Sequence, residues 1–436
     1  MTECKSEPLQ FANTNGRKVE VNFEGKEVSS DAGILLLKQA DQKLGLLQKF
    51  ADNITDHRRI KSCAHSVSSM LRQKIFGLGL GYEDLNDHNL LRKDTALQTA
   101  VGVEKDLASS PTLCRFENTA DRSTAIAAHK AMFSVFIQSF STPPKELILD
   151  FDPTDDRVHG SQQGKHYHGY YGHDCFLPLY VFCGDQLLVS YLRPSNIDGA
   201  KHAWAILALL VKALREAWPT VNITFRADSG FCRDQLLSWC ERNSVGYIVG
   251  ISKNNRLRKL AVSTEKKAAR EYYKSGERTR CFSYVKYRAK SWKSKRKIIV
   301  KTERHEDGSS SRFLVTNIRG HSDHLYEDLY CLRGNMENGI KQVQLDLFSD
   351  RTSCNDWYAN QFRVIASSMA YILLDAIRRI GLKGTKLAKA TVGTIRLKLL
   401  KVGAVIIKNT RRITLSFSSH YPDQNLFRTV ANALLE

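Results

Sequence analysis

The stretch from Lys145 to Ile251 limits the possible folds most, because its apolar residues fall in short runs. The runs "ELILDFD", "CFLPLYVFC", "QLLVSYLR" and "NITFRAD" have the length of strands and are separated by turn residues. The segment "GAKHAWAILALLVKALREAW", just before the last of these runs, has the periodicity of a helix. Neighbouring strands followed by a helix and a further strand predict a mixed α/β fold, with helices packed against a mixed sheet.

The charge balance indicates the kind of partner. Lys and Arg number 65 against 45 Asp and Glu, which gives a net charge of +20 and points to a polyanion such as nucleic acid. An anionic membrane is the alternative, but the longest uncharged apolar stretch, "VIASSMAYILL", is shorter than the roughly 20 residues of a spanning helix. The amino terminus has no apolar signal region, and the ten cysteines are scattered singly. We therefore expect a cytoplasmic protein with reduced thiols and no membrane partner.

The segment between Lys253 and Arg304 is the most basic part of the chain. It holds 19 Lys or Arg against four acids, with aromatic residues between them. A solvated charged face or a disordered segment is one interpretation. The alternating pattern of "CFSYVKYRAK" favours the other, a β-rich insertion that lies on a phosphate backbone. Its candidate DNA contacts are Lys293, Lys295, Arg296 and Lys297.

Changes in sequence pattern divide the chain into five predicted regions. Apolar residues three and four positions apart predict helices from about Asp31 to Thr142. The regions are a mainly helical DNA-binding or accessory region at 1–142, the first part of a catalytic core at 143–252, the basic β-rich insertion at 253–312, the second part of the core at 313–380 and a basic C-terminal region at 381–436.

Carboxylates follow two of the predicted strands. In "LILDFDPTDD" the strand period of two places Asp150 and Asp152 on one face, and Pro153 ends the strand. In "NITFRADSGF" a second strand ends at Asp228. Each motif alone is typical of a turn or a helix cap. Together they place carboxylates where open sheets present ligands, at the carboxyl ends of the strands.

A third motif, "YCLRGNMENGIKQ", adds a helix-borne carboxylate. Tyr330, Arg333 and Glu337 fall at positions i, i+3 and i+7, so they share a helix face. Alone, this face would be read as a solvated polar stripe. Combined with the two strand-end aspartates, it supplies the oxygen ligands that a pair of Mg²⁺ ions needs to act on a phosphodiester.

The ordered set of these motifs resembles a known family. The text "LDFDPTDDRVHGSQ", "YLRPSNIDGA", "RADSGF" and Y-x-x-R-x-x-x-E is similar to that of bacterial insertion-sequence transposases of the DDE class. Within that class it looks like the IS-four-like branch, closest to the thirteen-eighty insertion-sequence family. Further similar text in "SSDAGILLL", "GYEDLNDHNLLR" and "KLLKVGAVIIKNTRRITLSFSSHYP" extends the resemblance over nearly the whole chain.

The resemblance implies a fold, a site and partners. It implies a ribonuclease-H-like core in which Asp152, Asp228 and Glu337 are catalytic and bind two Mg²⁺ ions, for which Mn²⁺ substitutes. Tyr330 and Arg333 would position a phosphate, and we expect Arg226 to contact DNA as well. The implied activity is cut-and-paste transposition through hairpin ends. The implied partners are terminal inverted repeats, target DNA and a second transposase copy in a synaptic complex, in the bacterial cytoplasm at the nucleoid.

Some assignments stay open at the level of sequence. Asp150 is the alternative metal ligand of the first strand. Family members often carry Lys seven residues after the glutamate, where this chain has Gln344, and Lys341 could supply that cation instead. The segment "GKHYHGYYGHDC" suggests a zinc site as the alternative to a loop and strand near the cleft. A nuclease without strand transfer and a catalytically silent DNA-binding relative are the competing functions.

Overall fold

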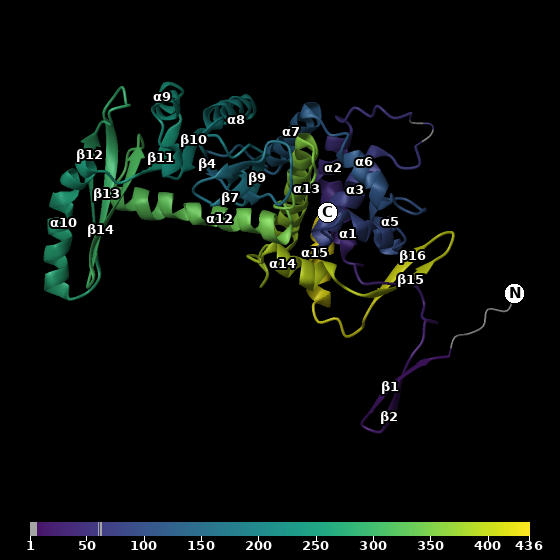
Figure 1. The fold of residues 1–436 in the computed structure, drawn as a ribbon. Helices are drawn as coiled ribbons and strands as arrows, with labels where there is room; N and C mark the ends of the chain where they lie inside the picture. Colours follow the sequence, from purple (N-terminus) through teal and green to yellow (C-terminus); the bar gives the residue numbers. More distant parts are fainter. Residues whose placement is uncertain (1–6, 60, 62) are drawn as a thin grey trace.

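A computed structural model describes residues 7–59, 61 and 63–436 of the chain (Figure 1). Its centre is an eight-stranded sheet with the order β12-β13-β14-β11-β10-β4-β8-β9. The predicted mixed α/β class is therefore confirmed. The first six residues, on which the expectation of no secretory signal partly rests, lie outside the described residues.

Five strands form the core of the sheet. Strands β4 (Glu146–Pro153), β8 (Leu179–Cys183) and β9 (Gln186–Tyr191) are antiparallel neighbours, whereas β10 (Asn222–Ala227) and β11 (Gly246–Ile251) run parallel to β4. Numbered as they occur in the chain, these five strands have the spatial order 3-2-1-4-5 with only the second reversed. This is the ribonuclease-H-like topology that the resemblance implies.

The two faces of the core sheet are covered by different helices. Helices α8 (Ala203–Ala217) and α9 (Asp234–Arg242) pack on the face that carries Phe151 and Phe225. The opposite face, which carries Tyr180 and Phe182, packs against α12 (Gly334–Lys341) and α13 (Trp357–Ala376). Asp150 pairs with Phe182 and Asp152 with Tyr180, so both aspartates lie on the side of α12.

The basic insertion continues the same sheet. Strand β14 (Gly308–Thr316) pairs antiparallel with β11, and β13 (Arg296–His305) and β12 (Thr279–Tyr287) follow outward. The insertion also contains a long helix, α10 (Asn255–Ser275), which the expectation of a β-rich segment did not include. The predicted boundary at residue 312 falls inside β14. The division into five regions otherwise stays a prediction.

One helical run crosses the sheet and carries the third motif. It begins with α11 (Ser322–His324), continues through a π-helical turn at Leu325–Tyr330 and a tighter 3-10 turn at Cys331–Arg333, and enters α12. A second π-helical turn, Gln342–Asp346, ends it. Figure 1 shows this run as a long green helix between the insertion and α13.

The amino-terminal helices surround α13, almost all of whose residues are buried. They form one apolar core with it and with the carboxyl-terminal elements. The helices are α1 (Ile34–Leu44), α2 (Leu46–Ala51), α3 (Val67–Leu80), α4 (His88–Leu91), α5 (Thr95–Val101), α6 (Ser110–Glu117) and α7 (Arg122–Gln138). The carboxyl-terminal elements are α14 (Val392–Ile395), β15 (Ala404–Lys408), β16 (Ile413–Phe417) and α15 (Gln424–Leu435).

Three small sheets complete the fold. Strand β3 (Val28–Ser29) pairs with β15, so an amino-terminal and a carboxyl-terminal segment share a sheet. Strands β5 (Asp156–Arg157), β7 (His173–Phe176) and β6 (His166–His168) form the second, which follows β4. The hairpin of β1 (Leu9–Thr14) and β2 (Arg17–Val21) projects away from the body (Figure 1). In the described part of the chain, no helix combines the length and apolar character needed to cross a membrane.

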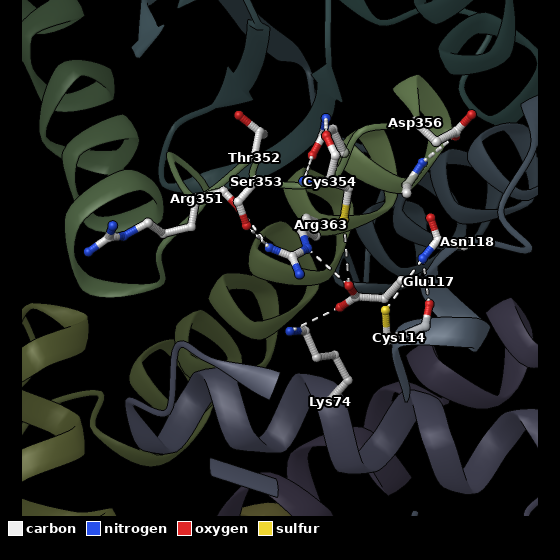
Figure 2. Close-up of polar contacts among 12 residues, drawn as sticks. Lys74, Cys114, Glu117, Asn118, Arg351, Thr352, Ser353, Cys354, Asp356 and Arg363 are labelled. Atoms are coloured by element: carbon white, nitrogen blue, oxygen red, sulfur yellow. Dashed lines mark hydrogen bonds and ion pairs between the residues drawn. The ribbon is translucent and has the colours of Figure 1, made fainter. Parts of the chain in front are cut away.

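A buried ion cluster joins the amino-terminal helices to α13 (Figure 2). The Glu117 carboxylate on α6 lies 3.1 Å from the Lys74 Nζ of α3 and 3.0 Å from the Arg363 Nε of α13. Arg363 also donates to the Arg351 carbonyl at 3.1 Å and to the Ser353 hydroxyl at 2.6 Å. Each charge in this cluster thus has a partner inside the protein.

Candidate active site

The two strand-end aspartates lie at the same edge of the sheet. Strands β4 and β10 are parallel and in register, with Asp150 opposite Arg226 and Phe151 opposite Ala227. Asp152 on β4 and Asp228 after β10 therefore follow at the carboxyl edge of neighbouring strands. Asp228 also caps the short turn that comes after it, since its carboxylate accepts a hydrogen bond from the Gly230 N–H at 2.9 Å.

The helical run brings Arg333 between the carboxylates. The Arg333 Nη1 lies 3.1 Å from Asp152 Oδ2, and its Nη2 contacts the Glu337 carboxylate one turn along the helix. Tyr330 is on the same helix face, and its hydroxyl approaches the backbone of Gly250. A Cβ added at Gly250 would lie 3.1 Å from this hydroxyl and 2.9 Å from the Ser229 nitrogen. The close approach of Tyr330 to the Asp228 turn therefore requires glycine at position 250.

The electrostatics of this edge favour a cation. The pKa of Asp152 is raised to about 7, mainly by burial and also by the negative charges of Asp228 and Glu337, against the opposing effect of Arg333. The same three carboxylates, together with Tyr330, raise the pKa of Arg333 against the effect of its burial. Three carboxylates thus share one guanidinium, and the site has an excess of negative charge.

The donor set fits a hard divalent cation, because all its candidate ligands are carboxylate oxygens. Within the residues described, no three His, Cys, Asp or Glu side chains are grouped closely enough to hold a metal ion as they stand. The guanidinium of Arg333 lies between Asp152 and Glu337 in this arrangement. Ion binding would therefore require Arg333 to give up one or both of these contacts.

Asp150 and Arg226 lie inside the protein. Asp150 is 1% exposed and Arg226 is 5% exposed, and they form a two-point ion pair in which Nη2 lies 2.7 Å from Oδ2. Arg226 also donates to the Leu329 carbonyl in the first π-helical turn of the helical run. Asp150 thus has an internal partner, which disfavours it as the alternative metal ligand. The expectation that Arg226 contacts DNA is likewise not supported, because its guanidinium is enclosed.

The four candidate DNA contacts of the insertion divide into two groups. Lys293 and Lys295 are exposed, and Lys297 is half-buried, with its Nζ donating to the Gly320 carbonyl at 3.1 Å. Arg296 is 4% exposed and pairs with Asp234 and Glu241 on α9 at 2.7 Å each. Its predicted contact with DNA is not supported, because these internal ion pairs occupy its guanidinium.

Gln344 has a role that the sequence analysis missed. Its amide Nε2 donates to the Asp155 carbonyl at 2.9 Å, and its Oε1 accepts from the Thr154 hydroxyl at 3.3 Å. It thus fastens the end of the helical run to the turn that follows Asp152. Position i+7 from Glu337 on the same helix was the available signal. Lys341 is exposed on α12, one turn beyond Glu337.

The histidine segment forms the sheet of β5, β6 and β7 beside the site. His173 Nε2 lies 3.0 Å from the Asp155 carboxylate. Asp156 is buried and accepts a hydrogen bond from the Thr352 hydroxyl at 2.8 Å, and burial raises its pKa to about 8. Nothing in the described chain groups His166, His168 and His173 into a metal site. The structure therefore does not support the zinc alternative.

Comparison with known families assigns the chain to a protein family. Its residues 11–436 match the family described as Transposase DDE domain group 1. The chain therefore belongs to this family of DDE transposases, and the predicted transposase class is confirmed. Membership of the family also implies an enzyme that acts on DNA with the help of divalent metal ions.

Two further comparisons add little. No curated protein matches the sequence. Among solved structures, the chain is similar to a piggyBac transposase in a cryo-EM structure of a synaptic complex with hairpin DNA. The identity is 10% and the TM-score 0.41, and the similarity covers 86% of this chain and 82% of that chain. We base no conclusion on a likeness of this degree.

Proposed function

We propose that this chain is the transposase of a bacterial insertion sequence, in the IS-four-like superfamily and closest to the thirteen-eighty family. It binds the terminal inverted repeats as double-stranded DNA, cuts both ends through hairpin intermediates and joins them to target DNA. It acts as a homodimer in the synaptic complex, in the cytoplasm at the nucleoid. The observation that carries the proposal is the convergence of Asp152, Asp228 and Glu337 around Arg333 at one sheet edge, in a chain of this family.

The three carboxylates are the proposed holders of two Mg²⁺ ions, for which Mn²⁺ substitutes. When bound, the ions would activate the attacking oxygen and stabilise the leaving oxygen of an in-line displacement. Asp152 supports this role because it is deeply set among like charges, whose repulsion a cation relieves. Asp228 is held in place by the N–H of Gly230, so its carboxylate is oriented before any ion arrives.

Arg333 and Tyr330 are the proposed phosphate-positioning residues. A guanidinium released from Asp152 and Glu337 has the fork geometry that matches two phosphate oxygens. The Tyr330 hydroxyl lies against the Asp228 turn, where it can donate to a neighbouring phosphate oxygen. Exposed Lys293 and Lys295, together with Lys297 and Lys341, would neutralise phosphates farther along the duplex.

The test is cleavage and joining of DNA that carries the element's ends. Purified protein would be incubated with this DNA and either Mg²⁺ or Mn²⁺, and products would be resolved on denaturing gels. Asp228→Asn and Glu337→Gln should each lower the cutting rate by about 10³-fold or more while DNA binding persists. Glu216→Gln on the exposed face of α8 is the matched control and should cut like the parent.

Each competing function predicts a different result. Open double-strand ends with no hairpin and no joining would indicate the nuclease alternative. Retarded DNA without any cut product, under every metal tested, would indicate a silent DNA-binding relative. If both carboxylate variants cut and joined at the parental rate, the site assignment itself would be wrong.

A further inference from the structure

The hairpin of β1 and β2 presents an apolar face to solvent. Alternate residues of a strand share a face, and the register of the hairpin therefore sets two apolar pairs side by side, Leu9 with Val21 and Phe11 with Val19. Phe11 is 57% exposed and Leu9 is 53% exposed. The other face is polar, and there Gln10 donates to the Glu20 carboxylate at 2.8 Å. An isolated two-stranded hairpin is only marginally stable in water, so this apolar face requires a surface to pack on.

The segment that carries this hairpin differs from the rest of the chain in charge. Residues 7–27, here called the amino-terminal arm, hold four Glu and three Lys or Arg, a net charge of −1 in a chain of +20. A surface that binds nucleic acid needs an excess of basic side chains. The arm also contains Phe23, which is 83% exposed and follows β2. An apolar and slightly acidic arm indicates a protein partner rather than DNA.

A second exposed apolar face lies on the small sheet of β16, β15 and β3. One side of this sheet is closed, since Ala404 and Ile406 of β15 are buried against the body. The register places five uncharged residues on the other side, here called the outer sheet face: Val28, Val405, Ile407, Thr414 and Ser416. Val28 is 62% exposed and Ile407 is 50% exposed. The solvent side of an antiparallel sheet is normally polar, so an apolar one marks a contact surface.

We propose that the amino-terminal arm of one copy packs its apolar face on the outer sheet face of a second copy, and that the second copy does the same in return. This proposal rests on the proposed function in taking a second copy of the chain as the partner. Two sheet faces can pack together through their apolar side chains. A reciprocal exchange of identical arms closes a two-fold dimer with two equal contacts. The arm is placed for this exchange, because its hairpin projects away from its own body (Figure 1).

The size of the two faces fits a stable dimer. Burial of one large aromatic side chain removes about 150–250 Å² from solvent, and each arm holds Phe11 and Phe23. Each chain also contributes the aliphatic residues of the arm and its own outer sheet face. The area buried by one chain is therefore on the order of the roughly 800 Å² that each partner buries in a standard interface.

The charges of the two faces are complementary. The hairpin of β15 and β16 ends in a basic tip with exposed Lys408, Arg411 and Arg412. An arm of net charge −1 is attracted to this tip. Two copies that each carry a net charge of +20 repel each other over most of their surfaces. A contact through the arm and an uncharged sheet face avoids most of that repulsion.

Other occupants fit these surfaces less well. Two arms packed against each other would leave the outer sheet faces of both copies exposed. An arm folded back on its own sheet would have to reverse direction within residues 22–27, whereas the hairpin extends away from the body (Figure 1). Both arrangements predict results that differ from those of an exchange between copies.

The experiment measures association of the full-length protein without DNA, by sedimentation equilibrium. The arm variant carries Phe11→Ser and Val21→Ser, and the sheet variant carries Val28→Ser and Ile407→Lys. Each variant alone should have a dimer dissociation constant raised by about 100-fold or more. An equimolar mixture of the two should associate again, more weakly than the parent, because the intact arm of the sheet variant can pack on the intact sheet of the arm variant. Gln10→Ala changes the polar face of the same hairpin and should dimerise like the parent.

The mixture separates the possible arrangements. Its recovery would support the exchange and would also show that both variants are folded. A sheet variant that dimerises like the parent would indicate contact between arms and would overturn the proposal. A mixture that stays monomeric, with circular dichroism spectra like that of the parent, would overturn it as well. A parental protein that cuts and joins its DNA ends but stays monomeric without DNA would overturn the arm exchange alone. A parental dimer that depends on the arms but never cuts DNA would count against the proposed function alone.

Discussion

The two charged clusters of this molecule differ in how completely their charges are paired. In the buried cluster, the Glu117 carboxylate lies between Lys74 and Arg363, and the remaining donors of Arg363 find a carbonyl and a hydroxyl. At the sheet edge the ratio is inverted, since Asp152 and Glu337 both contact the single guanidinium of Arg333, and Asp228 lies near enough to raise its pKa. The first cluster is closed by protein groups. The second has negative charge left over, and it lies where strands β4 and β10 end.

The difference separates a structural use of charge from a functional one. Buried charges cost free energy unless every one is paired, so a cluster that only joins helices should be fully satisfied. A site that binds cations needs carboxylates that protein groups do not already neutralise. Carboxylates that are already paired gain little free energy when an ion binds. The raised pKa of Asp152 results mainly from its burial, and the unneutralised charges of Asp228 and Glu337 add to it. Four predictions test this contrast.

The largest effect is expected for Arg333→Ala. Removal of the guanidinium leaves the three carboxylates without a protein cation. It also removes the two hydrogen bonds that we propose the guanidinium donates to the scissile phosphate. Cutting of DNA ends should fall by about 10³-fold. Added Mg²⁺ should raise the Tm of this variant more than that of the parent, because the ion replaces the lost charge. An equal rise of Tm with Mg²⁺ in both proteins would contradict the claim that the sheet-edge carboxylates, unlike the buried cluster, bind cations.

The next effect is expected at the buried cluster. Glu117→Gln leaves Lys74 and Arg363 as uncompensated buried cations, so the free energy of unfolding should fall by about 3 kcal/mol, measured by urea titration. The cutting rate per folded molecule should not change. The triple variant Lys74→Met, Glu117→Leu and Arg363→Met removes all charges together and should cost far less than the single change. If the single change lowered the free energy of unfolding less than the triple change, the stability of the cluster would not depend on charge pairing.

A smaller effect is expected from pH. The folded-state pKa of Asp152, about 7, lies above its ordinary value of 3.8, so between these values the native state binds a proton that the unfolded chain releases. Stability due to this group is complete below pH 3.8 and is lost as the pH rises through 7. Without divalent ions, the stability of Asp152→Asn relative to the parent should therefore rise by about 3 kcal/mol between pH 4 and 7. A difference in the free energy of unfolding that stayed constant over this range would argue against a raised pKa of Asp152.

The smallest effect is expected for Gln344→Ala. The change removes the two hydrogen bonds to the turn of Thr154 and Asp155, so the helix of Glu337 and the strand of Asp152 lose a tie of about 1 kcal/mol per bond. The cutting rate should fall about tenfold while DNA affinity is unchanged, as measured by single-turnover kinetics. Gln10→Ala removes a surface hydrogen bond to Glu20 and serves as the control. A loss of affinity without a loss of rate would assign Gln344 to DNA binding instead.

Sequence patterns were sufficient to predict the strand ends and the helix that carry the candidate site residues. The ends of two strands and the face of one helix follow from periods of two and 3.6. These periods place Asp152, Asp228 and Glu337 without knowledge of the tertiary structure. The mixed sheet follows in the same way, from the order of the strand and helix patterns.

The surroundings of some candidate residues depend on register and on distant partners, which local patterns do not show. Asp150 was a candidate ligand until the pairing of β4 with β10 placed Arg226 opposite it. Arg296 belongs to a basic segment but meets two acids of α9, more than fifty residues earlier in the chain. Helix α10 was hidden by its dense charge, although its buried Leu257, Ala261, Thr264 and Ala268 follow the helical repeat. Net charge reports on a surface as a whole, and it cannot tell which cations are already paired.

The uninterrupted sheet fixes the distance between the insertion and the candidate active site. Strand β12 is the fifth strand away from β4, and neighbouring strands are about 4.8 Å apart, so the outer strand of the insertion lies roughly 24 Å from the strand of Asp152. At about 3.4 Å per base pair, this distance spans about seven base pairs of DNA. Because hydrogen bonds connect every strand between them, a duplex that bound both β12 and the proposed active site could not slide between the two without bending this sheet. Under the proposed function, the number of strands would therefore set the distance between a DNA contact at β12 and the cut, whatever sequence the DNA carries.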